Sequence, residues 1–322
     1  MKKIAVADIE NIRIGQTENK DAATGCTVLI CPKGMRAGLD IRGGGPASRE
    51  TALLDPLMEA QIIHAVVLGG GSAFGLNAAG GVMQLLEERG IGLDVGITKV
   101  PLVVQSDIFD LTVGDSKVRP DSIMGREAAR LALDAPNYRD GNYGAGCGAT
   151  VGKFGGMENC MKSGIGSYAV QIGELKIGAV AVLNAAGDVF DHKTAKKIAG
   201  MLAPDKKGFA DASELIAQHI SPVGNKFTEN TTISAIITNA EFNKAELCKI
   251  AGMAHDGYAR SISPVHTSVD GDSIYALSVG NIKADKDAVG ILAAEVVSEA
   301  LKCAVYSAQT AYGIIAAQDL SF

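Results

Sequence analysis

Segments with strand character and segments with helix character come in pairs along this chain, rather than in strict alternation. Residues 167–172 and 175–183 are apolar segments typical of strands, and they follow one another directly. The other expected elements are strands near 66–68, 231–238 and 273–279 and helices at 76–89, 122–133, 244–260 and 284–312. This order favours a layered α/β/β/α sandwich over a doubly wound parallel sheet.

The composition permits a large buried core. Of 322 residues, 47% are apolar and 20% are charged, so residues 1–322 are expected to form one large domain. Glycine is unusually frequent, at 39 residues, and it clusters in loops between apolar segments. Many tight turns and close backbone contacts are therefore expected. Residues 191–230 differ from the rest, because they are rich in Lys, Asp, Ala and Pro. They indicate an exposed excursion with one helix near 212–220.

Charge and cysteine usage limit the possible partners. The formal net charge is −6 and no basic stripe is present, so a nucleic-acid partner is not expected. No apolar segment is long enough to span a membrane, and the first residues do not form a signal peptide. The six cysteines show no CxxC pair or zinc-ligand spacing. A cytoplasmic protein with reduced thiols, and without a metal or an organic cofactor, is expected.

Two glycine-rich segments imitate nucleotide-binding or hydrolase motifs but fail on inspection. In the loop Gly69–Gly75, Phe74 stands where both GxGxxG and GxSxG require a small residue. A turn whose backbone N–H groups contact an oxyanion, with Gly70, Gly71 and Ser72, is the better interpretation. The segment Gly148–Lys153 lacks one residue of a P-loop spacing.

The junction between Asn230 and Thr231 has a more specific chemical meaning. A polar residue at the end of the excursion meets a threonine that opens a β-branched, buried strand. If the Thr231 hydroxyl attacks the carbonyl of Asn230, an N-to-O acyl shift gives an ester, which water then cleaves. The new chain begins at Thr231, whose free amine has a reference pKa of about 7.7–8.0 and can activate its own hydroxyl.

Such an amine needs an anchor, and two carboxylates are candidates. Asp270 and Asp272 flank Gly271 just before a predicted strand, so both are expected to reach one point. Two carboxylates would hold the ammonium group and tune its pKa. The alternative is that residues 270–272 form an ordinary turn, because Asp-Gly is a common turn pair.

Several separate motifs, in order along nearly the whole chain, resemble the self-processing L-aminopeptidase/D-esterases (peptidase family S58), which include β-aminopeptidases and 6-aminohexanoate-oligomer hydrolases. They are Gly70–Leu76 with Ala78–Met83, Gly148–Lys153, Asn230–Ile233, Met253–Gly257 with Arg260, Pro264–Thr267, and Asp270–Asp272. The resemblance implies an α/β/β/α sandwich of the N-terminal-nucleophile type, formed jointly by fragments 1–230 and 231–322.

The resemblance also implies roles for individual residues. Thr231 would be the nucleophile, with its amine positioned by Asp270 and Asp272. Lys153 would lie near the nucleophile and help its ionisation, and Asn184 would donate its side-chain amide to the oxyanion. Many members have a tyrosine where this chain has Phe109, so the second oxyanion donor is left open and a backbone N–H is one candidate. Structural roles for Lys153 and Asn184, as a solvated lysine and a turn residue, also stay open.

The expected activity is hydrolysis of an amide bond in a small peptide or amino-acid amide, through an acyl-Thr231 intermediate. A homo-oligomer, such as a tetramer of processed protomers, is expected.

Two alternatives to this function remain. An amino-acid N-acyltransferase would use the same threonine but pass the acyl group to an amino acid. A non-enzymatic ligand-binding protein would use the glycine loops and stay uncut. The sequence leaves the substrate's α- or β-amino type and its chirality undetermined.

Overall fold

A computed structural model describes residues 1–211 and 230–321 of the chain. Ten strands form one hydrogen-bonded network, in the order β1-β11-β12-β15-β17-β3-β5-β8-β4 with β2 paired to β3. Their bounds are β1 Lys2–Ile4, β2 Arg13–Asn19, β3 Thr24–Ile41, β4 Ala47–Arg49, β5 Ile63–Gly69, β8 Val103–Asp107, β11 Ile165–Ile172, β12 Leu175–Val182, β15 Ile233–Ala240 and β17 Ser273–Ile282.

The long strand β3 joins two sheets. Its residues 36–41 pair with β17 in the first sheet, whereas residues 24–30 pair with β2 and residues 26–30 with β5 in the second sheet. Most pairs are antiparallel, but β15 pairs with β17 in parallel. Side chains from both sheets share one apolar core, so the sheets pack face to face.

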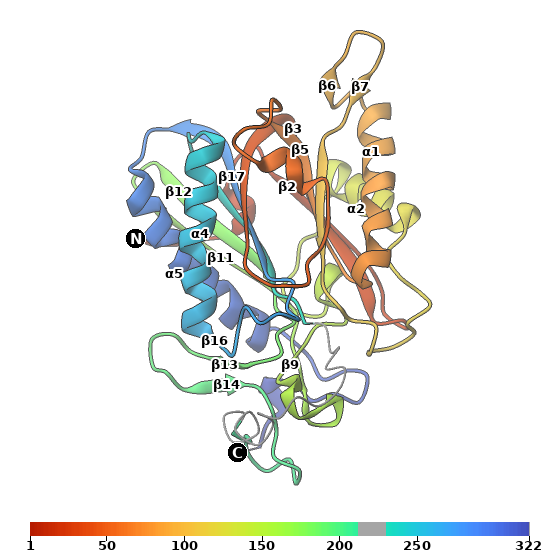
Figure 1. Ribbon diagram of the computed structural model, residues 1–322, viewed down its shortest axis with the longest axis vertical. Coiled ribbons are helices and arrows are strands. Elements are labelled where there is room, and N and C mark those ends of the chain that lie inside the picture. The colour runs from red at the N-terminus through yellow and green to blue at the C-terminus, as the bar shows by residue number, and fades with distance from the viewer. Residues whose placement is uncertain (212–229, 322) are drawn as a thin grey trace.

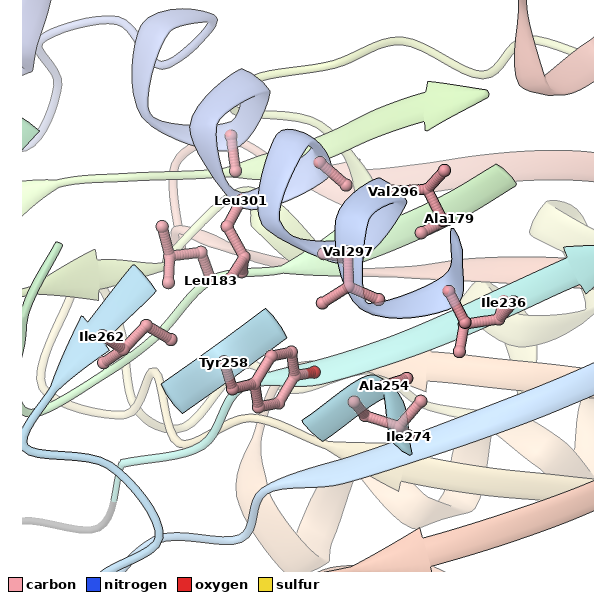
Figure 2. Close-up of a cluster of buried hydrophobic side chains, with 14 of the residues drawn as sticks. Ala179, Leu183, Ile236, Ala254, Tyr258, Ile262, Ile274, Val296, Val297 and Leu301 are labelled. Atoms are coloured by element: carbon pink, nitrogen blue, oxygen red, sulfur yellow. The ribbon is translucent and has the colours of Figure 1, made fainter. Parts of the chain in front are cut away.

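Strand β15 shows how alternation produces the layers. Ile233, Ala235 and Ile237 point into the core between the sheets. Ile236 faces the other way, into a core shared with helices α4 (Lys244–Ser261) and α5 (Lys286–Tyr306). Figure 2 shows this second core, where Tyr258, Ala254, Val296, Val297 and Leu301 of the helices meet Ile236, Ile274, Ala179 and Leu183.

Two further helices cover the outer face of the second sheet. Helices α1 (Ala78–Glu88) and α2 (Ser122–Asp134) pack on side chains of β3, β5 and β8 to form a third core. Figure 1 shows α4 and α5 on one side of the strands and α1 and α2 on the other. The predicted four-layer α/β/β/α sandwich is therefore confirmed.

Some predicted boundaries differ from the observed ones. The last helix ends at Tyr306 rather than near Tyr312, because the Asn142 side chain exchanges two hydrogen bonds with the backbone of Gln309 and holds the following segment away from a helical path. The excursion is exposed only in part, since Ala199, Met201 and Leu202 are buried. The helix expected near 212–220 lies outside the described residues.

Short strands complete the structure around one end of the sandwich and at a hairpin after α1. They are β6 Leu93–Asp94, β7 Lys99–Val100, β9 Thr150–Val151, β10 Met161–Lys162, β13 Asp188–Phe190, β14 Lys197–Ala199 and β16 Ile262–Ser263. Within residues 1–211 and 230–321, no helix has the length and apolar character that a membrane span requires.

The layers approach so closely that Gly166→Ala should destabilise the fold. A Cβ at Gly166 in β11 would lie 2.2 Å from the Ala304 nitrogen and 2.3 Å from the Ala300 oxygen of α5. Overpacking of this kind costs about 1–3 kcal/mol, so the melting temperature should fall. Gly208→Ala, where an added Cβ meets nothing within 4 Å, is the control. Equal melting temperatures for the two variants would contradict the close packing.

Candidate active site

The Asn230–Thr231 peptide lies immediately before β15, on an extension of its parallel pairing with β17. Asn230 bridges to Asp270, and Ser273 N donates to Thr232 O at 3.2 Å. The Gly271 N–H donates to the carbonyl oxygen of Asn230 at 2.9 Å. The carbonyl at the predicted cleavage point is therefore already held by a backbone donor. The strand was expected to begin at Thr231, and regular strand geometry begins at Ile233.

The Thr231 side chain lies against Gly271. Thr231 is 4% exposed, and a Cβ at Gly271 would lie 2.7 Å from its Oγ1 and 3.1 Å from its Cγ2. Only a residue without a side chain leaves the hydroxyl this space. Gly271 was considered in the sequence only as part of a turn, because its contact with Thr231 depends on the register between the two segments.

Asn184 joins the predicted residues into one hydrogen-bonded group. Its backbone oxygen accepts from Thr231 N at 3.0 Å and from Lys153 Nζ at 3.1 Å. Its side-chain oxygen accepts from Lys153 Nζ at 2.9 Å and from Thr150 N at 3.0 Å. Its amide Nδ2 donates to the backbone oxygen of Phe109 at 2.9 Å. The Asn184 amide that was expected to face an oxyanion thus donates to the Phe109 carbonyl in the uncut chain.

Lys153 follows β9 and is 6% exposed. Burial lowers the pKa of its ammonium group to about 7, against a smaller opposing influence from Cys160, Asp270 and Asp110. A neutral amine has two N–H bonds and one lone pair. Its two hydrogen bonds to Asn184 use two N–H bonds, so the neutral form keeps a lone pair for accepting a proton. A buried, partly neutral lysine is a suitable general base near neutral pH.

The two carboxylates accept hydrogen bonds from different groups in the uncut chain. Asp270 Oδ2 accepts from Thr267 N at 2.7 Å. Asp272 Oδ1 accepts from Thr232 N at 2.8 Å, and its Oδ2 contacts His266 Nδ1 at 2.9 Å. Burial and the neighbouring Asp272 charge raise the pKa of Asp270. The carboxylates therefore hold the segment before Gly271, at His266 and Thr267, and the residue that follows Thr231.

The backbone N–H groups of residues 70–72 donate to other segments of the protein. Gly70 N donates to Gly25 O at 2.9 Å and Ser72 N to Ile108 O at 3.0 Å. Gly71 N donates to Asp110 Oδ1 at 2.7 Å. Asp110 is buried, and burial raises its pKa to about 6. These residues order the loop beside Asp110, and the hydrogen bonds that the structure gives them do not include Thr231.

Two structural supports of the site were missed in the sequence. Lys162 is fully buried, and its ammonium donates to the backbone oxygens of Gly146, Ala149 and Ser163, which order the segment before Lys153. Residues 42–45 donate four backbone hydrogen bonds to the oxygens of Thr267, Asp270 and Asp272. The run Gly43-Gly44-Gly45 could have indicated a close backbone contact from the sequence. Lys162 could not have been identified, because a single lysine in an apolar segment has no recognisable pattern.

One cluster among the described residues has donors of the kind that bind metal ions. Ligand atoms of His192, Glu295 and Glu299 lie within 4.8 Å of one another. The Lys193 ammonium lies 3.0 Å from Glu295 and 2.5 Å from Glu299, so one positive charge is already paired with both carboxylates. The cluster shares no residue with the group around Thr231.

The chain matches the family model Peptidase family S58 over residues 5–318. It is 36% identical over 347 residues to an uncharacterized aminopeptidase of Mycobacterium tuberculosis (strain ATCC 25618 / H37Rv), covering 98% of this chain and 97% of the relative. It is 29% identical over 311 residues to the 6-aminohexanoate-oligomer endohydrolase of Agromyces sp. (strain KY5R), covering 91% and 84% of the two chains.

Solved structures of similar fold agree with these sequence matches. The L-aminopeptidase D-Ala-esterase/amidase of Ochrobactrum anthropi, which has a variant of the Ntn-hydrolase fold, superposes with a TM-score of 0.68 at 17% identity, covering 94% of this chain and 86% of that chain. A Burkholderia sp. beta-aminopeptidase superposes with a TM-score of 0.64 at 19% identity, with the same coverage. The chain belongs to peptidase family S58 and is a hydrolase with peptidase activity.

Proposed function

We propose that this chain cuts itself between Asn230 and Thr231, and that the released Thr231 then hydrolyses amide bonds as an N-terminal nucleophile. The observation that carries the proposal is the arrangement at one peptide bond. The Asn230 oxygen accepts from Gly271 N at 2.9 Å, and the Asn184 oxygen that accepts from Thr231 N also accepts from Lys153 Nζ.

Self-cleavage begins when the Thr231 hydroxyl attacks the carbonyl carbon of Asn230. Lys153, as the neutral amine, accepts the hydroxyl proton. The Gly271 N–H, already bonded to the Asn230 oxygen, stabilises the negative charge that develops on that oxygen. The C–N bond breaks, the proton passes to the Thr231 nitrogen, and an ester links Asn230 to Thr231 Oγ1. Water hydrolyses the ester, leaving a carboxylate on Asn230 and a free amine on Thr231.

The same group then serves turnover of substrate. The Thr231 amine accepts the hydroxyl proton while the hydroxyl oxygen attacks the substrate's amide carbonyl, and it then passes that proton to the leaving nitrogen. The amine product leaves, and water hydrolyses the acyl ester. The Gly271 N–H is released when Asn230 departs, so it becomes a donor for the substrate's oxyanion. This assigns a backbone N–H to the position left open by Phe109.

The substrate class follows from the relatives. One relative is named an aminopeptidase, and another is named a 6-aminohexanoate-oligomer endohydrolase. We therefore propose small peptides or amino-acid amides as substrates. The expected homo-oligomer stays a prediction.

Removing one hydroxyl should abolish self-cleavage. Thr231→Val keeps the shape of the side chain but lacks the nucleophile, so denaturing electrophoresis should show one intact chain and no amidase activity. Wild-type protein should give fragments 1–230 and 231–322. Thr232→Val is the matched control, because this neighbour is equally buried and should still be cut. Cleavage of Thr231→Val at the same bond would disprove the proposal.

Gly271→Ala should slow self-cleavage specifically. The new Cβ would lie 2.7 Å from Thr231 Oγ1, so the hydroxyl must move. Misplacement of about 1 Å costs roughly 100-fold in rate. The time course of fragment appearance after synthesis measures the effect. Gly208→Ala, in open space, should be processed like wild type, and an unchanged rate in Gly271→Ala would contradict the assigned geometry.

Self-cleavage should depend on pH through Lys153. Because the pKa of Lys153 is lowered to about 7, the basic form falls about tenfold per unit below that pH. The rate should therefore rise from pH 5 to about 7 and level off above it. Lys153→Met should lower the rate by about 10²–10⁴-fold and remove this rise. A wild-type pH profile in Lys153→Met would show that another group is the base.

A further inference from the structure

A cavity lies at the N-terminal edge of the first sheet, remote in sequence from the residues around Thr231. It has a volume of about 540 Å³, within the range of small-molecule sites. Its walls come from β1, the start of β2, the segment before Asp140, and β11. Its lining includes Lys3, Ile4, Arg13, Tyr138, Arg139 and Asp140. None of them belongs to the active-site group.

The floor of this N-terminal pocket is apolar and aromatic. Val6, Ile12 and Ile14 are buried there at the margin of the core between the sheets. Ile4 and Tyr138 pack against the same core while remaining partly exposed. Tyr138 donates its hydroxyl to Asp140 Oδ1 at 2.8 Å, so its ring is fixed in orientation. Such a surface accepts an aliphatic or aromatic body.

Three basic residues, Lys3, Arg13 and Arg139, are among those that line the pocket. The Lys3 ammonium lies 5.1 Å from the Tyr168 ring centre. The Arg139 guanidinium lies 3.9 Å from the Tyr143 ring centre. Arg13 donates to the backbone oxygen of Leu133 at 2.6 Å. Among residues 1–211 and 230–321, the ion pairs within 4 Å do not include any of these three cations.

The single carboxyl group in the pocket does not balance these charges. Asp140 is engaged by the Tyr138 hydroxyl, and burial raises its pKa. The nearby Asp134, outside the pocket, is already paired with Arg89 at 2.8 Å. The lining contains three basic residues and one carboxyl group, so its net charge favours an anion over a cation.

We infer that the N-terminal pocket binds a small organic anion, an arylalkyl or medium-chain carboxylate, with its apolar body on the Tyr138 and isoleucine surface and its carboxylate between Lys3 and Arg139. This site is separate from the proposed catalytic site, and the inference does not depend on the cleavage chemistry.

A matched set of three probes tests the charge preference. 4-Phenylbutyrate, 4-phenylbutanol and 4-phenylbutylamine share one apolar body but are anionic, neutral and cationic. Calorimetric titration into the full protein should show that the anion binds at least tenfold more tightly than the amine, with the alcohol between them. Equal or reversed affinities would overturn the inference.

Variants locate the binding. Lys3→Ala and Arg139→Ala should each weaken 4-phenylbutyrate binding about threefold to tenfold, and the double variant more. Lys2→Ala is the matched control, because Lys2 is the preceding residue of β1 and is absent from the pocket lining. This variant should leave the affinity unchanged.

Ala7→Trp, at an exposed lining position, should block the pocket. Binding that survives both Ala7→Trp and the double variant would place the ligand elsewhere and refute the site. Wild-type amidase activity in these variants would verify that they are folded.

Discussion

The parallel register that aligns residues 230–232 with residues 270–272 determines the geometry of the whole site. It places Gly271 beside Thr231, so that the glycine gives space to the hydroxyl and its N–H bonds the Asn230 oxygen. A shift by one residue would turn the Thr231 side chain to the opposite face of the strand. The buried alternation of β15 prevents that shift, because Ile233, Ala235 and Ile237 would leave the core between the sheets.

Burial also determines how readily two lysines near the site lose a proton. Lys153 is enclosed, and the loss of hydration lowers its pKa to about 7. Lys162, equally enclosed, has a pKa lowered to about 7 by the same cause. Lys162 is satisfied by three backbone oxygens, whereas Lys153 is directed to Asn184 and so toward Thr231. The two lysines share one environment, but only one of them contacts the residue that also binds the Thr231 nitrogen.

The layers of the fold could be predicted because alternation and helical spacing are local properties. A four-layer arrangement can be inferred from the residues of β15 and β17 and from the paired helices. This inference needs no knowledge of contacts between segments distant in the sequence. Thr231 could be proposed as a nucleophile from the sequence, since a polar residue meets the start of an apolar strand at one peptide bond. Lys153 and Asn184 could be named only through resemblance. Their contact with Thr231 joins three segments distant in the sequence, and no local pattern specifies that contact.

The least predictable features were contacts in which a backbone group replaces a side chain. Gly271 resembles an ordinary turn residue until the register with Thr231 is known, and the donors of residues 42–45 act through N–H groups that every residue except proline has. The sequence suggested that Asp270 and Asp272 reach one point, because they flank Gly271 just before a predicted strand. In the uncut chain they instead hold Thr267, His266 and Thr232.

That arrangement has a consequence for the proposed reaction. The Thr232 N–H donates to Asp272 at 2.8 Å, and the Thr232 oxygen accepts from Ser273 N at 3.2 Å. The chain is therefore anchored one residue after the nucleophile. Scission before Thr231 removes the covalent tie to Asn230 but none of these bonds, so the new N-terminus keeps its position beside Lys153 and Gly271. A threonine at a strand entry can thus lose its preceding residue without losing its orientation, and the geometry that favours self-cleavage persists for later turnover.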